Sequence, residues 1–298
     1  MNRFFIYFPI ILVFGILTIV MSLLYLLRKY QQVKGYRSPF TGKFLRSPGQ
    51  SLNRQIAKIN DEIIIHLVWM ITIPLMLYAY YISLLYFGTS KPSITILVLT
   101  IILGMGFTVY CLIRLLKHLN LRRSYGLGYE GEIAVGQELN QLMLDGYRVY
   151  HDFPADKFNI DHIVVGPPGV FAIETKARSK PTSKDRKADA KVKYDGNCLR
   201  FPNATDVESI EQAKRHAEWL SKWLRSSTGE RISVRPVLAL PGWFVERTAS
   251  GGISVINPKN FRSIAKPIAG NILCDHMISR IARQHERKCR DVEPKARD

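Results

Sequence analysis

The segment 159–176 constrains the fold of this chain more than any other part of its sequence. Two runs of β-branched and apolar residues flank a Gly-Pro-Pro-Gly sequence at 166–169, and this pattern predicts two strands joined by a tight turn. If the turn is centred on the two prolines, Asp161 lies directly opposite Glu174 in an antiparallel hairpin. Lys176 follows Glu174 by two residues and therefore points to the same face. The sequence predicts two carboxylates and an ammonium group on one face of a sheet.

Carboxylates directly opposite each other on neighbouring strands are about 5 Å apart and repel. The repulsion is relieved if both oxygens bind a hard divalent cation, for which Mg²⁺ is the expected ion and Mn²⁺ a substitute. Asp161 and Glu174 are therefore predicted metal ligands, and Lys176 is placed to orient a water molecule or stabilise an anionic oxygen.

A third carboxylate is predicted on a helix at 130–144. Glu132 shares the face of this helix that carries a stripe of apolar residues at helical spacing. A carboxylate on an inward face costs free energy unless it is paired or bound to a metal. The alternative is that Glu132 lies in the first helical turn and only complements the helix dipole. The predicted stripe consists of Val135, Leu139, Leu142 and Met143.

The elements after residue 125 predict an α/β domain with a mixed central sheet flanked by helices. The order is helix, strand, hairpin, helix and two further strands, and the hairpin strands are nearly continuous apolar runs, as expected of a buried sheet. The later helix, at 206–225, carries Gln212 at the border of its apolar stripe. We expect this domain to occupy 125–298.

A strongly basic segment follows the hairpin directly. A run of this kind is usually a solvated loop, but its position beside the acidic hairpin also suits an arm that contacts nucleic-acid phosphates. Its cationic residues are Arg178, Lys180, Lys184, Arg186, Lys187, Lys191 and Lys193.

The first 124 residues predict a membrane region with three α-helical spans, at about 4–27, 63–87 and 93–116. Each run is long and apolar enough to cross a bilayer, which takes about 20 residues. A cleaved signal peptide is the alternative for the first run, but that run is too long for one and lacks a small-residue cleavage site. The region 1–124 holds 14 Lys/Arg against 2 Asp/Glu and so carries 12 of the 18 net positive charges.

The basic residues cluster in the loop 28–62 and after the third span, which predicts that both lie in the cytoplasm and that the N-terminus lies outside. We expect a multi-pass protein of a bacterial inner membrane with its soluble domain in the cytoplasm. The high net charge then describes the membrane topology more than a nucleic-acid partner. The four cysteines show no CxxC motif, so neither a disulfide framework nor a structural zinc site is expected.

The sequence resembles a known family in two motifs. Gly-Tyr-Glu-Gly-Glu-Ile-Ala-Val at 128–135 and the hairpin sequence at 159–176 look like the NERD (nuclease-related) domain of the PD-(D/E)XK nuclease superfamily, and the resemblance covers roughly 126–255. It implies a restriction-endonuclease-like fold with a metal site formed by Glu132, Asp161 and Glu174. It further implies that Lys176 is the catalytic lysine and that Gln212 is a supporting polar residue.

Two functions follow from these expectations. The first is a membrane-anchored, Mg²⁺-dependent endonuclease that hydrolyses phosphodiester bonds of DNA or RNA at the cytoplasmic face. The second is a catalytically inactive, membrane-tethered module that binds nucleic acid or serves as a scaffold. A weaker third possibility is a membrane assembly protein whose partner is another protein chain.

Overall fold

The computed structural model describes residues 42–88, 92–181, 190–266 and 272–292, together with scattered helical residues between Phe8 and Leu27. The chain divides into two compact units. The first unit comprises 1–41, 56–123 and 294–298, and the second comprises 42–55 and 124–293. Each unit is described by itself.

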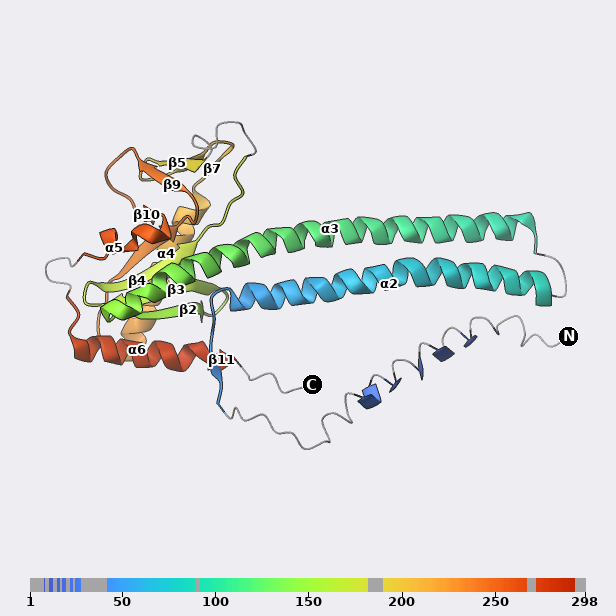
Figure 1. The fold of residues 1–298 in the computed structure, drawn as a ribbon, viewed down its shortest axis with the longest axis horizontal. Helices are drawn as coiled ribbons and strands as arrows, with labels where there is room; N and C mark the ends of the chain where they lie inside the picture. Colours follow the sequence, from blue (N-terminus) through green and yellow to red (C-terminus); the bar gives the residue numbers. More distant parts are fainter. Residues whose placement is uncertain are drawn as a thin grey trace. The chain divides into compact units, whose positions relative to one another are not determined.

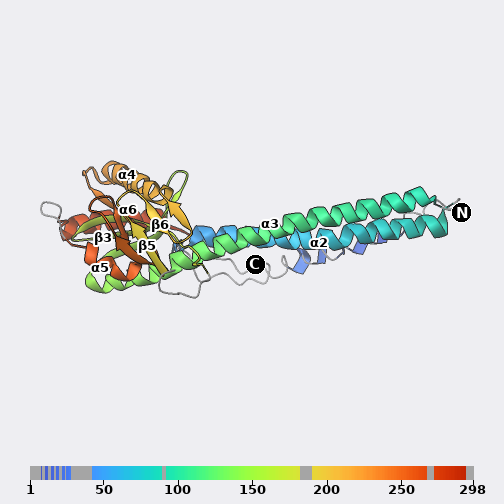
Figure 2. The ribbon, with the colours of Figure 1, turned by 90° about the horizontal axis from the view of Figure 1, so that it is seen from above.

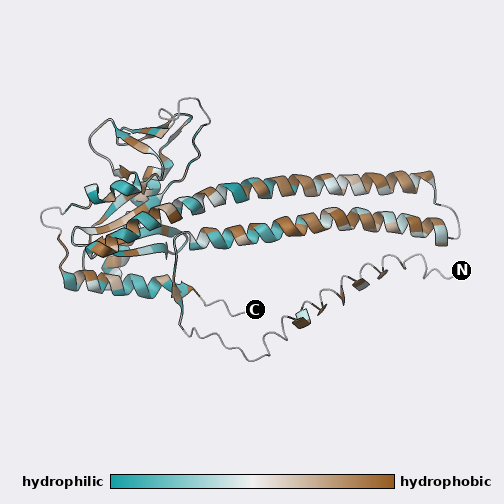
Figure 3. Cartoon of the chain, in the orientation of Figure 1, coloured by the Kyte–Doolittle hydropathy of each residue, from teal (hydrophilic) through white to brown (hydrophobic). Residues whose placement is uncertain are grey.

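Two long helices, α2 (Gln50–Phe87) and α3 (Ile94–Asn140), dominate the first unit. Their segments within this unit lie side by side (Figures 1 and 2), and Figure 3 shows hydrophobic residues concentrated towards the connection between them. Their most apolar 18-residue windows have mean hydropathies of 1.9 and 2.5 and are only 0% and 11% buried. A core helix of a soluble protein would be mostly buried, so by length and composition these two helices could cross a membrane.

Three membrane spans were predicted. In the described part of the chain only two helices, α2 and α3, are suitable for crossing a membrane. The first predicted span, at 4–27, lies largely outside the described residues. Helix α2 begins at Gln50, within the predicted loop 28–62. Helix α3 continues without interruption past the third predicted span and includes Glu132, because glycine inside a helix costs only about 1 kcal/mol.

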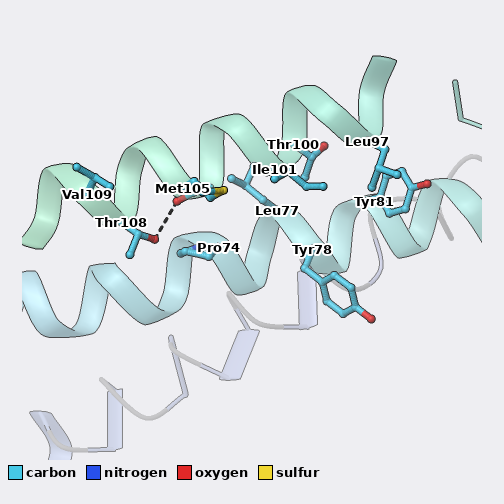
Figure 4. Close-up of a pocket in the computed structure, with 11 residues that line it drawn as sticks. Pro74, Leu77, Tyr78, Tyr81, Leu97, Thr100, Ile101, Met105, Thr108 and Val109 are labelled. Carbon is cyan, nitrogen blue, oxygen red and sulfur yellow. Dashed lines mark hydrogen bonds between the residues drawn. The ribbon is translucent and has the colours of Figure 1, made fainter. Parts of the chain in front are cut away.

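An apolar pocket of about 540 Å³ lies between α2 and α3 (Figure 4). Pro74 of α2 faces Gly104 of α3, where a side-chain carbon would come within about 4.0 Å of the proline ring. Thr108 donates its hydroxyl to the Gly104 carbonyl of its own helix, at 2.8 Å. The Thr108 hydroxyl is thus paired within its own helix, as an apolar environment requires.

The second unit is built on a five-stranded mixed sheet in the order β10-β8-β4-β3-β2. Strands β2, β3 and β4 pair antiparallel, whereas β4 pairs parallel with β8 and β8 pairs parallel with β10. The sheet confirms the predicted mixed architecture. Its strands are β2 (Arg148–Pro154), β3 (Asn159–Gly166), β4 (Gly169–Thr175), β8 (Val234–Ala239) and β10 (Ser254–Ile256).

Helices cover both faces of this sheet. The end of α3 packs on one face through Val135 and Leu139, which are both buried. Helices α4 (Glu208–Thr228) and α6 (Asp275–Cys289) pack on the other face. The prediction that Met143 is buried is wrong, since its side chain is 47% exposed. The α-helical spacing ends at Asn140, and η1 (Gln141–Asp145) continues as a 3₁₀ helix with a shorter period.

A second sheet, in the order β7-β6-β5-β9, contains the antiparallel β5–β6 hairpin. A short β1–β11 pair joins the N-terminal part of this unit to the residues after α6. The remaining elements are β1 (Phe44–Leu45), β5 (Lys191–Tyr194), β6 (Leu199–Phe201), β7 (Ala204–Asp206), β9 (Phe244–Arg247), η3 (Pro258–Asn260), α5 (Phe261–Ile264) and β11 (Arg290–Val292).

Candidate active site

The hairpin register brings Asp161 and Glu174 to the same place in the sheet. Strands β3 and β4 pair from Gly166 opposite Gly169 to His162 opposite Ile173, so Asp161 and Glu174 are the residues next to the last pair. The Asp161 carboxylate also accepts a hydrogen bond from the backbone N–H of Thr175, at 2.7 Å. The predicted register is confirmed over all the paired residues.

Strand β3 departs from regular alternation around Asp161. Ile160 and Ile163 are three residues apart but belong to the same buried cluster, whereas side chains of a regular strand repeat every two residues. Strand β2, which pairs with β3 on its other side, contains Asp152. The φ of Asp152 is +48°, a left-handed value that is uncommon for a residue other than glycine. Local irregularities of this kind re-aim side chains beside functional sites.

Helix α3 reaches the end of β4 because residue 131 is glycine. A side-chain carbon at Gly131 would lie only 2.5 Å from the Cβ atom of Ala177 and 3.6 Å from Thr175. The close approach positions the next residue, Glu132, whose side chain is buried. The glycine before Glu132 in the sequence motif is thus a packing requirement of the site.

The Glu132 carboxyl is held in unfavourable surroundings for a charge. Its pKa is raised to about 9, mainly by burial and also by the nearby charges of Asp161, Asp152 and Glu174. Its Oε2 atom is buried and has no hydrogen-bond partner. A first-turn role that only complements a helix dipole does not describe this residue, since α3 begins at Ile94.

Glu174 lies at the α4 face of the sheet. Burial raises its pKa to about 8, while Lys176, the hydrogen bond from Gln212 and the charge of Arg215 act in the opposite direction. The Gln212 side-chain amide donates to Glu174 Oε1 at 2.7 Å. Gln212 therefore orients one oxygen of this carboxylate. The second oxygen, Oε2, has no hydrogen-bond partner of suitable geometry.

The pKa of Asp161 is raised well above its ordinary value, first by burial and then by the charge of Glu174. The Lys176 ammonium lowers the pKa of both carboxyls, so its charge lies near them. Its side chain is half-buried. The electrostatics thus associate the carboxyls of Asp161 and Glu174 with Lys176, and the Glu132 carboxyl with those of Asp161 and Glu174.

Sequence reasoning missed Asp152. Its carboxylate accepts hydrogen bonds from the Ser51 backbone and hydroxyl and from Arg46 Nη1, the last at 3.0 Å. Arg46 also forms a two-point ion pair with Asp291, with N···O distances of 2.8 and 2.6 Å. Arg46 is one of the basic residues of the loop 28–62, which the sequence placed in the cytoplasm. No local sequence pattern connects it with residues more than 100 positions away.

Sequence reasoning also assigned no role to three histidines of this region, His151, His162 and His216. His216 Nδ1 lies 2.9 Å from Glu174 Oε2, and burial lowers the pKa of this imidazole to about 4, so it is neutral at pH 7. His162 follows Asp161 in the chain, and its Nδ1 lies 2.8 Å from Nδ1 of His151. The pKa values of both are lowered by burial. The spacing of His216 four residues after Gln212 was the available signal.

A pocket of about 470 Å³ opens beside Glu174. Gln212 and His216 line it, together with cationic and aromatic side chains of α4. Phe158 stacks on the His216 imidazole at 4.3 Å between ring centroids. The remaining lining residues are Arg215, Glu218, Trp219 and Lys222.

The predicted basic arm is described only in part, because Lys184, Arg186 and Lys187 lie outside the described residues. Lys191 and Lys193 alternate with buried residues of β5 and are exposed on the outer face of the second sheet. Arg178 and Lys180 lie over the rings of Phe201 and Trp243, at 4.7 and 5.8 Å from their centroids.

The carboxyl cluster fits a divalent cation by its chemistry. It offers oxygen donors, two of which are buried without a hydrogen bond, and its raised pKa values show that burial and neighbouring carboxyls disfavour the negative charge. Among the described residues, however, it does not form a closed set of three with all ligand atoms within 4.8 Å of one another. Such an open arrangement suits Mg²⁺, which usually keeps several water ligands.

No curated protein and no solved structure matches the chain. The family model of the nuclease-related domain (NERD) matches residues 127–241. This range includes Glu132, the hairpin with Asp161, Glu174 and Lys176, and the part of α4 with Gln212. Domains of this kind suggest a nuclease-like function, imply an interaction with nucleic acid and generally use divalent metals. Residues 127–241 of this chain are thus similar to the nuclease-related domain.

Proposed function

We propose that this protein is a membrane-anchored, metal-dependent nuclease that hydrolyses phosphodiester bonds of DNA or RNA. The observation that carries the proposal is a set of three buried or partly buried carboxyls, each with a raised pKa, with the Lys176 charge acting on two of them, Asp161 and Glu174. Buried carboxylates without a cation cost several kcal/mol, so a purely structural cluster would be selected against. A perturbed and convergent set of this kind marks functional sites.

Asp161, Glu174 and Glu132 would hold the cation, with Mg²⁺ as the expected ion and Mn²⁺ as a substitute. Bound there, the ion supplies positive charge to the phosphate and lowers the pKa of a coordinated water. Gln212 orients Glu174, because its amide donates to Oε1, while Oε2 lies 2.9 Å from His216 Nδ1. Gln212 is therefore a positioning residue.

Lys176 is the proposed catalytic lysine. Its charge acts on both Asp161 and Glu174, so it lies within electrostatic reach of a phosphate bound at the same place. An ammonium group there can orient the attacking water or stabilise the developing anionic oxygen. Neutral His216 beside Glu174 can accept a proton and would then carry a positive charge.

The nucleic acid would follow the basic residues that flank the carboxyl cluster. Lys191 and Lys193 are exposed in the described part of the predicted arm, and Arg215 and Lys222 line the pocket beside Glu174. Contacts of this type are to phosphates and carry no sequence information. DNA and RNA are both possible substrates on this basis.

Helices α2 and α3 would anchor the protein in the membrane. Together with a third span at about 4–27, they would leave the N-terminus outside and the nuclease-related domain in the cytoplasm of a bacterium. The support is their length, their hydropathy and the exposure of their apolar side chains. The excess of Lys/Arg in 28–62 and after residue 116 gives the orientation.

The test uses the full chain purified in detergent, with supercoiled plasmid DNA and single-stranded RNA as substrates. We expect cleavage in Mg²⁺, none in EDTA, and a loss of at least about 100-fold for both Asp161→Asn and Glu174→Gln. Each amide keeps the hydrogen-bond acceptor of the original side chain. Glu286→Gln is the matched control, because Glu286 is 47% exposed on α6.

The second candidate is an inactive nucleic-acid-binding module. It is favoured by the open arrangement of the carboxyl oxygens and by pKa values that keep Glu132 and Glu174 protonated near neutral pH without a cation. It predicts salt-dependent binding without cleavage in any divalent metal. Cleavage that survives both substitutions would instead show that the site lies elsewhere.

A further inference from the structure

We propose that Glu62, His66 and His118 form a second metal site, for a divalent transition-metal ion such as Zn²⁺, that joins helices α2 and α3. The three side chains offer one carboxylate oxygen and two imidazole nitrogens, and these ligand atoms all lie within 4.8 Å of one another. Among the described residues no other group of three meets this condition. All three residues belong to the first compact unit, outside the nuclease-related domain.

The spacing of the ligands follows from helix geometry. Glu62 and His66 are four residues apart on α2 and therefore share one face of that helix. His118 comes from α3, and its ring lies 5.1 Å from the ring of His66 with an interplanar angle of 41°. The two imidazoles are not stacked, so their nitrogen-bearing edges can face a common point. A bound ion would link the two helices.

The hydrogen bond of His66 selects the nitrogen that binds. His66 Nδ1 lies 2.7 Å from the backbone carbonyl oxygen of Glu62. A carbonyl oxygen only accepts, so Nδ1 must carry the proton and donate. Nε2 then has the free lone pair. Metal-binding histidines usually donate their other ring N–H to a carbonyl or carboxylate in this way, which fixes the tautomer and orients the ring.

His118 supplies the strongest indication that a ligand is required. Both of its ring nitrogens are buried, and neither has a hydrogen-bond partner. A buried polar atom without a partner costs about 1–3 kcal/mol. A cation bound to one nitrogen would remove part of this cost. A solvated Glu–His pair does not account for the unpartnered His118.

The donor set indicates the class of ion. Imidazole nitrogen favours zinc and other late transition metals, whereas Mg²⁺ and Ca²⁺ prefer oxygen ligands alone. Three protein ligands leave one position of a tetrahedral zinc ion for water or another ligand. Asn60 and Arg122 connect the same two helices nearby through a 2.7 Å hydrogen bond, so the helices are already held together at this level. The ion would add a stronger link beside it.

The test measures Zn²⁺ binding to the full chain in detergent, with Co²⁺ as a spectroscopic substitute. The protein carries Asp161→Asn and Glu174→Gln, so that metal bound by the carboxyl cluster does not contribute. We expect one Zn²⁺ per chain, a Co²⁺ absorption spectrum typical of nitrogen and oxygen ligands, and a Zn²⁺-dependent rise in melting temperature. His66→Ala and His118→Ala should each weaken Zn²⁺ binding by more than about 100-fold, since loss even of a residue that orients a ligand costs 10–100-fold.

Two controls separate ligand loss from misfolding. His118→Cys keeps a zinc ligand and should retain binding. His276→Ala removes an exposed histidine of α6 and should change nothing. Unchanged affinity in the two alanine variants, loss of binding in His118→Cys equal to that in His118→Ala, or no Zn²⁺ binding at all would overturn the proposal. None of these outcomes depends on whether the protein cleaves nucleic acid.

Discussion

The two clusters of ionisable side chains differ in their burial and in the donor atoms that they offer to a cation. The carboxyl cluster of Glu132, Asp161 and Glu174 is embedded in a sheet domain, contains only oxygen donors and has raised pKa values. The helix cluster of Glu62, His66 and His118 lies between two long helices, is more exposed and is rich in nitrogen donors. On this basis we propose one site for a hard cation and one for zinc in the same chain, which can be altered independently. Substitutions in one cluster leave the other as a reference.

Lys176→Met should produce the largest effect. Removing the ammonium leaves the carboxyl cluster without its nearest positive charge, so we expect nucleic-acid cleavage in Mg²⁺ to fall by at least about 100-fold. Zn²⁺ binding at the helix cluster should be unchanged. Lys214→Met is the control, because the side chain of Lys214 is 43% exposed on α4. Equal activity of Lys176→Met and wild type would remove the lysine from the mechanism.

The pH dependence of stability should distinguish the carboxyl cluster when no metal is present. Burial raises the pKa of Glu132 to about 9 and that of Glu174 to about 8, so the folded state binds more protons than the unfolded state. The contribution of these two groups to the free energy of unfolding is fully present below about pH 4.5. It is lost as the pH rises through 8 and 9. Urea denaturation in EDTA should show this fall, amounting to a few kcal/mol.

The substitutions Glu132→Gln and Glu174→Gln should flatten this pH profile, because an amide does not titrate. Glu62→Gln, in the helix cluster, should leave the profile unchanged. A wild-type stability that rises between pH 5 and 9 in EDTA would contradict the raised pKa values.

Gly131→Ala tests how α3 positions Glu132. The added carbon would lie 2.5 Å from Ala177 Cβ, and overpacking of this kind costs about 1–3 kcal/mol. We expect lower stability together with weaker cleavage. Gly126→Ala is the matched control, because it makes the same change in the same helix with no atom within 4 Å, and it should stabilise the helix by up to about 1 kcal/mol. A Gly131→Ala variant as stable as Gly126→Ala would show that the close approach is not required.

The smallest effect is expected for the basic arm. Lys191→Gln or Lys193→Gln should weaken nucleic-acid binding equally for all sequences and reduce the slope of log affinity against log salt by about 1. Filter binding at several salt concentrations measures this slope. An unchanged slope in the variant that carries both Lys191→Gln and Lys193→Gln would indicate that the described part of the arm does not contact phosphates.

The sequence predicted the hairpin register, the mixed sheet and the inward position of Glu132, because strand alternation and helical spacing are local signals. It did not predict Asp152 with Arg46, because that contact depends on the tertiary fold. Met143 was placed in the core by assuming an unchanged helical period, which ends at Asn140.

The helix cluster was not predicted either. His66 and His118 belong to two separate apolar segments, and only the alignment of α2 and α3 brings them together. The roles of Asp161, Glu174 and Lys176 remain predictions about chemistry, although the register that brings the two carboxylates together could be deduced from the turn alone.

Proton release on Mg²⁺ binding tests the central claim most directly. Glu132 and Glu174 are protonated at pH 7 without a cation, so their coordination of Mg²⁺ requires loss of these protons. Titration calorimetry of the full chain at pH 7, in buffers of different ionisation enthalpy, measures the number released. We predict about one to two protons per Mg²⁺ for the wild type and fewer for Glu132→Gln and Glu174→Gln. Mg²⁺ binding without proton release, or release that both variants retain in full, would contradict the assignment of these carboxyls as the metal site.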